Sequence, residues 1–393
     1  MTPAARLQAA IELLDQVIAA ARGDGAAADT LIARYFAQRR YAGSKDRRAV
    51  RELVYRAIRT FGQAPVSGRA AMVALARPDP DLAALFDGSP HGPAPMTDEE
   101  PAAEPALLPD WLEPLLAAPV GAAERRALLE RAPLHVRANA LRTTRDALLA
   151  IWPEARPVVG TVHGLSLPEG TNVEASESWQ HGLVEVQDAG SQMIVAACGA
   201  RPGMTVLDLC AGAGGKTLAL AADMAGEGRL MAADTDRARL SRLTPRAERA
   251  GASFIETRLL DPNRENANLA EISDACDVVL VDAPCSGSGT WRRNPEARWR
   301  LTPARLERIA ALQAHVLDIA APLVRPGGRL VFAVCSLIDR EGRTQTEAFL
   351  ARNPGWKAIA PEVADRAHGT GTLLLPGRDG TDGFFFAVLE RPC

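Results

Sequence analysis

The sequence predicts a doubly wound α/β fold, with a small α+β module and an all-helical N-terminal region ahead of it. From Gly203 onward, short apolar runs alternate with helical stretches, which indicates a mostly parallel sheet covered on both faces. Residues 133–185 mix strand-like alternation with one helical stretch, and residues 1–90 are rich in Ala, Leu and Arg. We therefore divide the chain into segments 1–132, 133–185 and 186–393.

The first segment has the pattern of a helical bundle. Apolar residues recur at helical spacing, as at Leu7, Ile11, Leu14 and Ile18, and the pattern returns near 31–36 and 49–61. Gly and Pro interrupt residues 88–110, where we expect a linker or a long surface loop. Residues 111–132 have the helical pattern again.

A cluster of basic residues lies in the same segment, with only Asp46 and Glu52 among them. Its members are Arg34, Arg39, Arg40, Lys45, Arg47, Arg48, Arg51, Arg56 and Arg59. One interpretation is a solvated helix face, and the other is a surface that binds phosphate groups. The predominance of Arg favours phosphate, because a guanidinium group can bind two oxygens at once.

The middle segment predicts a small α+β module. Residues 134–139 alternate like a strand, 144–152 have a helical pattern, and 158–167 and 183–186 again indicate strands. A further helix is expected to end near Ala200.

The third segment supplies the strands of the predicted sheet. Strand-like runs are 206–209, 229–233, 254–260, 278–281, 329–334 and 383–389, and helix-like runs are 216–224, 237–250 and 303–323. The run 278–281 is apolar throughout, as in a strand buried on both faces, and it ends at Asp282-Ala283-Pro284-Cys285. Because ligands bind at the carboxyl ends of such strands, Asp282 and Cys285 are candidates for chemistry.

A glycine-rich turn, Asp208–Thr217, joins the first strand of this sheet to its first helix. Its glycines let the backbone approach a ligand at the helix N-terminus. The Walker A pattern needs Gly where Cys210 stands, and the dinucleotide pattern needs Gly where Thr217 stands. Asp234, at the end of the next strand, can accept both hydroxyls of a ribose. This combination favours a nucleoside without phosphates, such as S-adenosylmethionine.

Two cysteines, Cys285 and Cys335, each follow the end of a strand. If these strands are neighbours, both thiols and Asp282 face one crevice; the alternative is a pair of buried structural cysteines. The set suits methylation of cytosine at C5, a carbon that is a poor nucleophile. A thiolate that adds to C6 enables C5 to attack a sulfonium methyl, while Asp282 can hold N3 and the exocyclic amine.

Composition bounds the remaining function classes. The net charge of −3 excludes a polycation, and the 6 Cys residues contain no CxxC pair, so we expect no metal site. There is no signal-peptide pattern, and no apolar stretch reaches the roughly 20 residues of a membrane span. We expect free thiols in a reducing cytoplasm and no membrane. The oligomeric state is not indicated.

Taken together, these motifs resemble the bacterial Sun/Fmu ribosomal RNA cytosine-5 methyltransferases, relatives of the eukaryotic NOP/Sun enzymes. The likeness spans about residues 134–390 and rests on Val186–Gln192, Asp208–Thr217, Asp282–Gly287 with Arg292–Pro295, Val334–Ser336 and Asp382–Phe385. The first segment is similar, more loosely, to the NusB-like RNA-binding domain of these enzymes.

The resemblance implies a Rossmann-like methyltransferase domain that uses S-adenosyl-L-methionine. Cys335 would be the nucleophile, Cys285 would assist product release, and Asp282 would contact the base. Contacts to the cofactor are expected at Cys210, Ala211, Gly212, Ala213, Gly214, Gly215, Lys216, Asp234, Asp261 and Asp282. Contacts to RNA are expected at Arg39, Arg40, Arg47, Arg48, Arg292 and Arg293.

The sequence departs from the family pattern without losing a catalytic group. Ala213 stands where the family usually has Pro, Val334 replaces Thr, and the Gly-Asp-Gly expected near Asp261 is absent. Of the Glu-Glu-Asn that usually follows the catalytic turn, only Glu341 agrees.

We therefore expect an S-adenosylmethionine-dependent RNA cytosine-5 methyltransferase, with 16S ribosomal RNA as the first candidate substrate. A transfer RNA methyltransferase of the same family is one alternative. A non-catalytic RNA-binding assembly factor with a decayed methyltransferase domain is another, and a nucleotide hydrolase is more distant.

Overall fold

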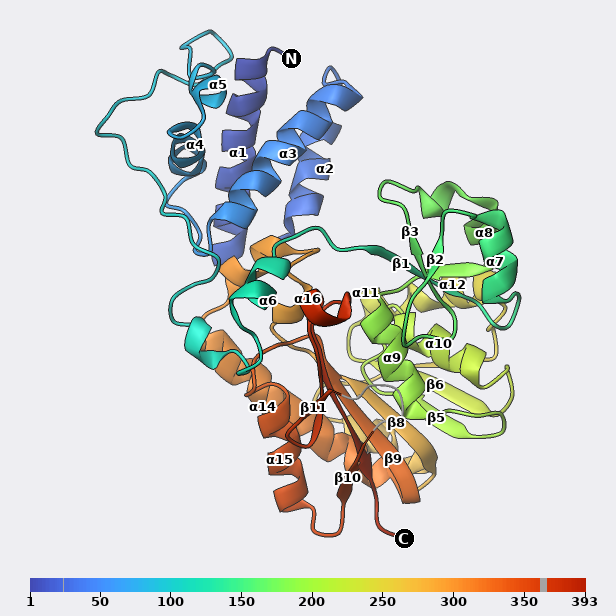
Figure 1. The fold of residues 1–393 in the computed structure, drawn as a ribbon. Helices are drawn as coiled ribbons and strands as arrows, with labels where there is room; N and C mark the ends of the chain where they lie inside the picture. Colours follow the sequence, from blue (N-terminus) through green and yellow to red (C-terminus); the bar gives the residue numbers. More distant parts are fainter. Residues whose placement is uncertain (24, 361–365) are drawn as a thin grey trace. The chain divides into compact units, whose positions relative to one another are not determined.

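A computed structural model describes residues 1–23, 25–360 and 366–393. The chain divides into two compact units (Figure 1). The helical unit comprises Met1–Glu130 and Thr290–Arg305, and the sheet unit comprises Arg131–Gly289 and Leu306–Cys393. Thr290–Arg305, which the sequence analysis assigned to the third segment, is thus grouped with the N-terminal helices.

The helical unit is built on four helices, α1 (Pro3–Arg22), α2 (Ala28–Ala37), α3 (Ser44–Thr60) and α4 (Gly68–Ala76). Helix α1 begins where the Thr2 hydroxyl accepts a hydrogen bond from Ala5 N, with Pro at the first helical position. Its apolar face, including Leu7, Leu14 and Val17, is fully buried in the core. The helical pattern predicted for residues 1–90 is confirmed.

The rest of the N-terminal segment is less regular than its sequence pattern predicts. Its shorter elements are α5 (Pro80–Ala83), the 3-10 helix η1 (Glu113–Leu115) and α6 (Ala122–Ala127). The continuous helix predicted for 111–132 is wrong, because Pro114 and Pro119 remove backbone donors and Gly121 follows them. Residues 88–110 contain neither a helix nor a strand, apart from one bridge between Phe61 and Ala106.

A segment far along the chain completes the helical unit. The 3-10 helix η5 (Pro295–Arg300) packs against α1 and α3, in orange beside the blue helices of Figure 1. Arg298 is fully buried, and its Nη2 donates to the carbonyls of Ile58 (2.5 Å), Arg59 (3.1 Å) and Phe61 (3.0 Å). Trp299 Nε1 also donates to Phe61 O, at 2.7 Å. The otherwise unpaired carbonyls at the end of α3 are therefore satisfied by η5.

The small module belongs to the sheet unit. Its strands are β1 (Leu134–Ala138), β2 (Arg156–Pro157), β3 (Gly164–Leu167) and β4 (Val184–Val186), with α7 (Arg145–Ile151), η2 (Val173–Ala175) and α8 (Glu177–Gln180). The strands form an antiparallel sheet in the order β2-β3-β1-β4. Val136, Leu148, Leu165 and Val184 are fully buried between this sheet and its helices. The predicted α+β pattern is confirmed.

The large sheet contains the predicted doubly wound arrangement. Its parallel strands are β5 (Thr205–Asp208), β6 (Arg229–Asp234), β7 (Glu256–Leu259), β8 (Cys276–Asp282) and β9 (Val324–Val334), and β13 (Phe384–Glu390) pairs antiparallel with β9. Among the described residues the order is β11-β12-β13-β9-β8-β5-β6-β7, with β10 beside β13. The connections reverse direction at β5 and β8, and ligands bind at such switch points.

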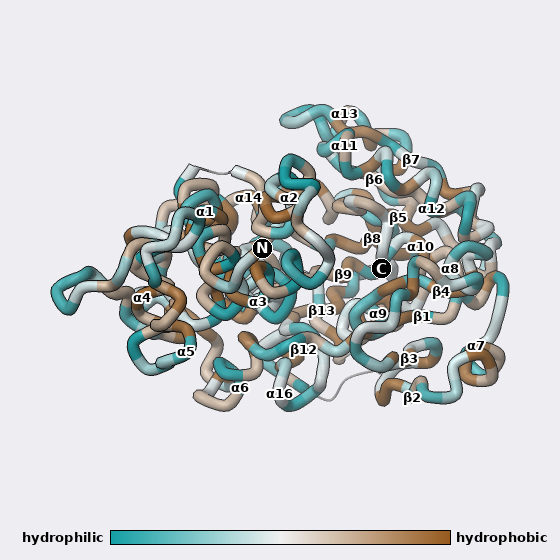
Figure 2. Tube along the Cα trace, turned by 90° about the horizontal axis from the view of Figure 1, so that it is seen from above, coloured by the Kyte–Doolittle hydropathy of each residue, from teal (hydrophilic) through white to brown (hydrophobic). Residues whose placement is uncertain are grey.

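Helices cover both faces of the large sheet. Helices α9 (Ala189–Cys198) and α10 (Gly215–Asp223) lie on one face, and α14 (Pro303–Ala320) and α15 (Arg343–Arg352) lie on the other (Figure 1). The remaining elements are α11 (Arg237–Leu240), α12 (Leu243–Ala250), α13 (Glu265–Asn268), η3 (Ala270–Ile272), η4 (Ser288–Thr290), η6 (Ala321–Leu323), β10 (Lys357–Ile359), β11 (Ala367–His368), β12 (Gly371–Leu374) and α16 (Pro376–Asp379). Figure 2 shows the hydrophilic turn around α13 and the apolar run of β8.

Candidate active site

A cavity of about 440 Å³ lies at the carboxyl ends of β5, β6, β8 and β9. Its lining belongs entirely to the sheet unit and comprises Leu209, Cys210, Asp234, Thr235, Asp236, Arg239, Leu260, Glu265, Asp282, Ala283, Pro284, Cys285, Leu312, His315, Val316, Ile319 and Cys335. Apolar residues of α14 form one wall, while acids and thiols from the strand ends form another. A concave site with few converging polar groups is typical of a small-molecule pocket.

The glycine-rich turn and Asp234 form one end of this cavity. Gly212 and Gly214 have φ of +54° and +79°, which a side chain would make unfavourable. Gly212 N donates to Asp234 Oδ2 at 2.8 Å, and Asp236 N donates to Asp234 Oδ1 at 2.7 Å. The carboxylate is thus held by backbone donors, and each oxygen can still accept from a ribose hydroxyl. Of the seven turn residues from Cys210 to Lys216, Cys210 is the one that lines the cavity.

Lys216 fixes the position of Asp282. Its Nζ lies 2.6 Å from Asp282 Oδ2 and 5.6 Å from the centre of the Phe384 ring. Burial pulls the pKa of Lys216 down, but the ion pair with Asp282 outweighs it and leaves that pKa raised. Lys216 therefore stays charged, and Asp282 faces the cavity as its partner.

Asp208 is a buried acid directly below the glycine-rich turn. Its Oδ2 accepts a hydrogen bond from Thr217 Oγ1 at 2.7 Å, and its Oδ1 has no partner among the described residues. Burial raises the pKa of Asp208 to about 7, against the opposing effect of the Thr217 hydrogen bond.

The two predicted thiols are in contact. Strands β8 and β9 are parallel neighbours, as the crevice prediction requires, and Cys285 Sγ lies 3.3 Å from Cys335 Sγ. The hydrogen bond to Cys335, followed by burial, raises the pKa of the Cys285 thiol well above its usual value. The two sulfurs are thus within hydrogen-bonding distance, and the shift favours the protonated form of Cys285.

The C-terminal signature supports both thiol-bearing turns. Gly289 N donates to Cys335 O at 3.0 Å, and Gly383 N donates to Gly289 O at 2.8 Å. A Cβ atom on Gly289 would overlap the backbone of Gly383, so both positions require the small residue. Asp382 N in turn donates to Asp188 Oδ2 at 3.1 Å, which joins the two signatures that lie outside the cavity.

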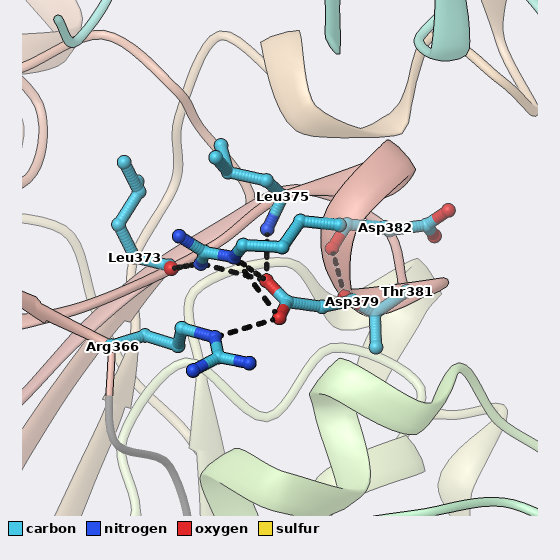
Figure 3. Close-up of polar contacts among 7 residues, drawn as sticks. Arg366, Leu373, Leu375, Asp379, Thr381 and Asp382 are labelled. Atoms are coloured by element: carbon cyan, nitrogen blue, oxygen red, sulfur yellow. Dashed lines mark hydrogen bonds and ion pairs between the residues drawn. The ribbon is translucent and has the colours of Figure 1, made fainter. Parts of the chain in front are cut away.

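Asp379 organises the turn that leads into this signature (Figure 3). It accepts hydrogen bonds from Leu375 N at 2.8 Å, Arg366 Nε at 3.1 Å and Arg378 Nη2 at 2.8 Å. Burial alone would raise the pKa of Asp379, but these donors outweigh it and lower that pKa. A charged carboxylate thus fixes the backbone just before Asp382.

Several cavity residues had not been identified from the sequence. Asp261 is exposed and does not line the cavity, whereas Leu260 and Glu265 do. His315 Nε2 on α14 lies 3.9 Å from Glu265 Oε2. Arg239 also lines the cavity. The position of Arg239 shortly after the ribose acid is the one signal that could have identified it.

The predicted RNA-binding arginines differ in their surroundings. Arg39 lies 3.6 Å from the centre of the Tyr35 ring and pairs with Glu12, and Arg47 Nε donates to Ala42 O at 2.9 Å. Arg40 and Arg48 are exposed, and their side chains have no hydrogen bond or ion pair within the described ranges. Arg292 is buried and Arg293 is half-buried.

Within residues 1–23, 25–360 and 366–393, no group of three or more His, Cys, Asp or Glu side chains could hold a metal ion. No helix of the same residues has the length and apolar character needed to cross a membrane.

Comparison with known proteins identifies the family. The family model of the 16S rRNA methyltransferase RsmB/F matches residues 196–390. Ribosomal RNA small subunit methyltransferase B of Salmonella arizonae is 35% identical over 267 residues, which are 67% of this chain and 60% of that protein. The probable ribosomal RNA small subunit methyltransferase B of Synechocystis is 32% identical over 298 residues, 72% of this chain and 66% of that protein.

Residues 196–390 belong to the RsmB/F methyltransferase family. The predicted family is thereby confirmed, and so is S-adenosylmethionine as its cofactor. The matched part spans less than two thirds of each relative's length.

Solved structures agree on the fold. The crystal structure of PH0851 has a TM-score of 0.78 at 23% identity and covers 100% of this chain and 99% of that one. NSun6 from Pyrococcus horikoshii with SFG has a TM-score of 0.64 at 17% identity, covering 72% of this chain and 97% of that one. These similarities confirm the predicted fold class.

Proposed function

We propose that this protein transfers a methyl group from S-adenosylmethionine to C5 of a cytosine in small-subunit ribosomal RNA, through a covalent adduct between Cys335 and C6. The single observation that carries the proposal is the pair of thiols, 3.3 Å apart, in one cavity with Asp282. The names of the related proteins favour ribosomal RNA as the substrate.

The residues at hand fit the cofactor. Asp234 would accept the ribose hydroxyls, and the glycine-rich turn at the start of α10 would approach the rest of the molecule. The apolar side chains of Leu312, Val316 and Ile319 offer a surface for a flat purine ring. When bound, S-adenosylmethionine supplies an electrophilic sulfonium methyl group.

The thiols divide the remaining chemistry between them. The Cys335 thiolate forms a bond to C6, and the electron pair of the C5–C6 double bond moves towards N3, which takes a proton from solvent, while Asp282 would accept a hydrogen bond from the exocyclic amine. C5 then takes the methyl group, loses its proton to a base, and the Cys335–C6 bond breaks to restore the thiolate.

Cys285 is suited to the final proton transfer. Its raised pKa depends first on the hydrogen bond to Cys335. Once Cys335 is bound to C6, its sulfur no longer carries a negative charge. The pKa of Cys285 then falls, so that Cys285 would give its proton to solvent and, as the thiolate, accept the proton from C5.

The exposed basic residues of the helical unit would bind RNA. Arg40 and Arg48 are exposed and unpaired among the described residues, which suits phosphate contacts. Lys45 and Arg34 share both properties and belong to the same basic cluster in the sequence.

The proposal is tested with labelled S-adenosylmethionine, purified protein, and unmodified 16S ribosomal RNA beside transfer RNA. We expect 5-methylcytosine in the ribosomal RNA only. Label in transfer RNA alone would mean that transfer RNA, not ribosomal RNA, is the substrate. Failure to bind the cofactor at all would favour the non-catalytic assembly factor.

A further inference from the structure

A buried carboxylate outside the cavity connects the two thiol-bearing turns. Glu341 is fully buried and does not line the cavity. Its carboxylate accepts hydrogen bonds from Ser286 N at 2.6 Å, Ser286 Oγ at 2.5 Å and Ser336 Oγ at 2.5 Å. Ser286 is the residue after Cys285, and Ser336 is the residue after Cys335. One side chain thus holds the position next to each thiol.

The hydrogen bonds around the Glu341 carboxylate extend into the backbone of both thiol-bearing turns. Gln313 Nε2 donates to Glu341 Oε1 at 3.3 Å and to the carbonyl of Pro284 at 2.9 Å, just before Cys285. Ser336 Oγ lies 3.0 Å from Ser288 Oγ, which accepts from Leu337 N at 2.9 Å. The network therefore reaches the backbone on both sides of the contact between the thiols.

We propose that Glu341 is a positioning residue that sets the separation between Cys285 and Cys335. This inference rests on the proposed function, because the thiol contact matters only if both sulfurs act on one base. The carboxylate is suited to the task because all its positions are acceptors, so backbone and hydroxyl donors from both turns can bind the same two oxygens.

The alternative is that Glu341 only stabilises the fold. A buried hydrogen-bonded group contributes to stability wherever it lies, so loss of folding by itself would not distinguish the two roles. The distinguishing feature is the geometry of the sulfurs, which can be measured without any RNA.

The experiment compares Glu341→Gln and Glu341→Asp with the wild-type protein. Glu307→Gln is the matched control, because Glu307 is an exposed acid whose partner Arg340 precedes Glu341. Three quantities are measured: the rate at which diamide closes a disulfide between Cys285 and Cys335, mapped by mass spectrometry; the Kd for S-adenosylmethionine; and kcat with RNA. Melting temperatures show that each variant is folded.

We expect Glu341→Gln to slow disulfide closure and kcat by about 10- to 100-fold, the effect of losing a charge-assisted hydrogen bond. The Kd for the cofactor should stay within about 2-fold, since Glu341 does not line the cavity. Glu341→Asp, which keeps the charge but shortens the reach, should fall between Glu341→Gln and the wild type, and Glu307→Gln should match the wild type.

Two results would overturn the inference. One is closure and kcat at wild-type rates in Glu341→Gln. The other is a parallel loss of cofactor affinity, which would indicate a general structural role. If closure depends on Glu341 but no RNA is methylated by the wild type, the proposed function fails while the positioning role stands.

Discussion

The turns that carry Cys285 and Cys335 differ from the basic cluster of α2, α3 and the turn between them in how they use their polar groups. In the sheet unit, Lys216, Asp282 and Glu341 are paired with groups from distant parts of the chain. In the basic cluster, Arg40 and Arg48 have no partner among the described residues. A site for chemistry fixes its side chains in advance, whereas a surface for a polyanion leaves its charges free.

The largest expected effect is at the thiols, where position should matter most. Cys335→Ser should lower methylation by at least about 10³-fold, because a serine hydroxyl is a far weaker nucleophile than a thiolate. Cys285→Ala should allow addition but not release, so a covalent protein–RNA adduct should accumulate and persist on a denaturing gel. Cys393→Ser, at an exposed thiol, is the control and should behave like the wild type. If the adduct forms with Cys335→Ala instead, Cys285 is the nucleophile and Cys335 assists release.

Asp208 is an exception among the buried polar groups of the sheet unit, because one of its two carboxylate oxygens has no hydrogen-bond partner among the described residues. Burial raises the pKa of Asp208 to about 7 in the folded protein, from about 4 for an aspartate in an unfolded chain. Between these values the folded protein holds a proton that the unfolded chain has lost, so this group lowers stability as the pH rises from about 4 to 7. Asp208→Asn should remove that loss, worth about 2–4 kcal/mol above pH 7 and little at pH 4.

Melting curves of both proteins from pH 4 to pH 8 measure this difference. Burial also raises the pKa of Asp223, to about 6, so both proteins should retain some pH dependence. A difference between them that does not grow with pH would mean that Asp208 is ionised in the folded protein.

Arg298 shows that an arginine of the helical unit can also be structural. Burial lowers the pKa of Arg298 to about 9, yet its Nη2 holds three carbonyls at the end of α3. Arg298→Ala should destabilise α3 by about 2–4 kcal/mol, visible as faster hydrogen exchange at its last turn. Arg300→Ala removes half-buried contacts to Gly25 O and Ala26 O and should cost less. If Arg298→Ala and Arg300→Ala destabilise the protein equally, the burial of Arg298 does not add to its stabilising effect.

Most elements of the sheet unit could be predicted from the sequence, but the position of η5 could not. Strand ends, glycine turns and thiols are local patterns, so the place of Asp234 at a strand end could be predicted, whereas the adjacency of β8 and β9 was a condition that the structure meets. The docking of Arg298 and Trp299 against α3 depends on residues more than 200 positions away, and neither residue has a distinctive local pattern. Asp261 was named by analogy alone, and the structure has Leu260 and Glu265 at the cavity instead.

The basic cluster also could not be fully interpreted from the sequence. Its composition indicates positive charge, but not which side chains are already paired within the protein. Arg39 and Arg40 are neighbours in sequence, yet Arg39 is bound to Tyr35 and Glu12 while Arg40 is exposed without a partner in the described structure. The spacing of basic residues does not reveal which of them already has a partner within the fold.

The smallest expected effect separates these arginines. Arg40→Ala with Arg48→Ala should weaken RNA binding and reduce the slope of log K against log salt by about 2, one for each lost phosphate contact. Arg39→Ala with Arg47→Ala removes the same charge from side chains already engaged within the protein, so the slope should change less. Binding is measured from 50 to 200 mM salt by fluorescence anisotropy. If both pairs change the slope equally, net charge alone governs binding, and the distinction between engaged and free arginines fails.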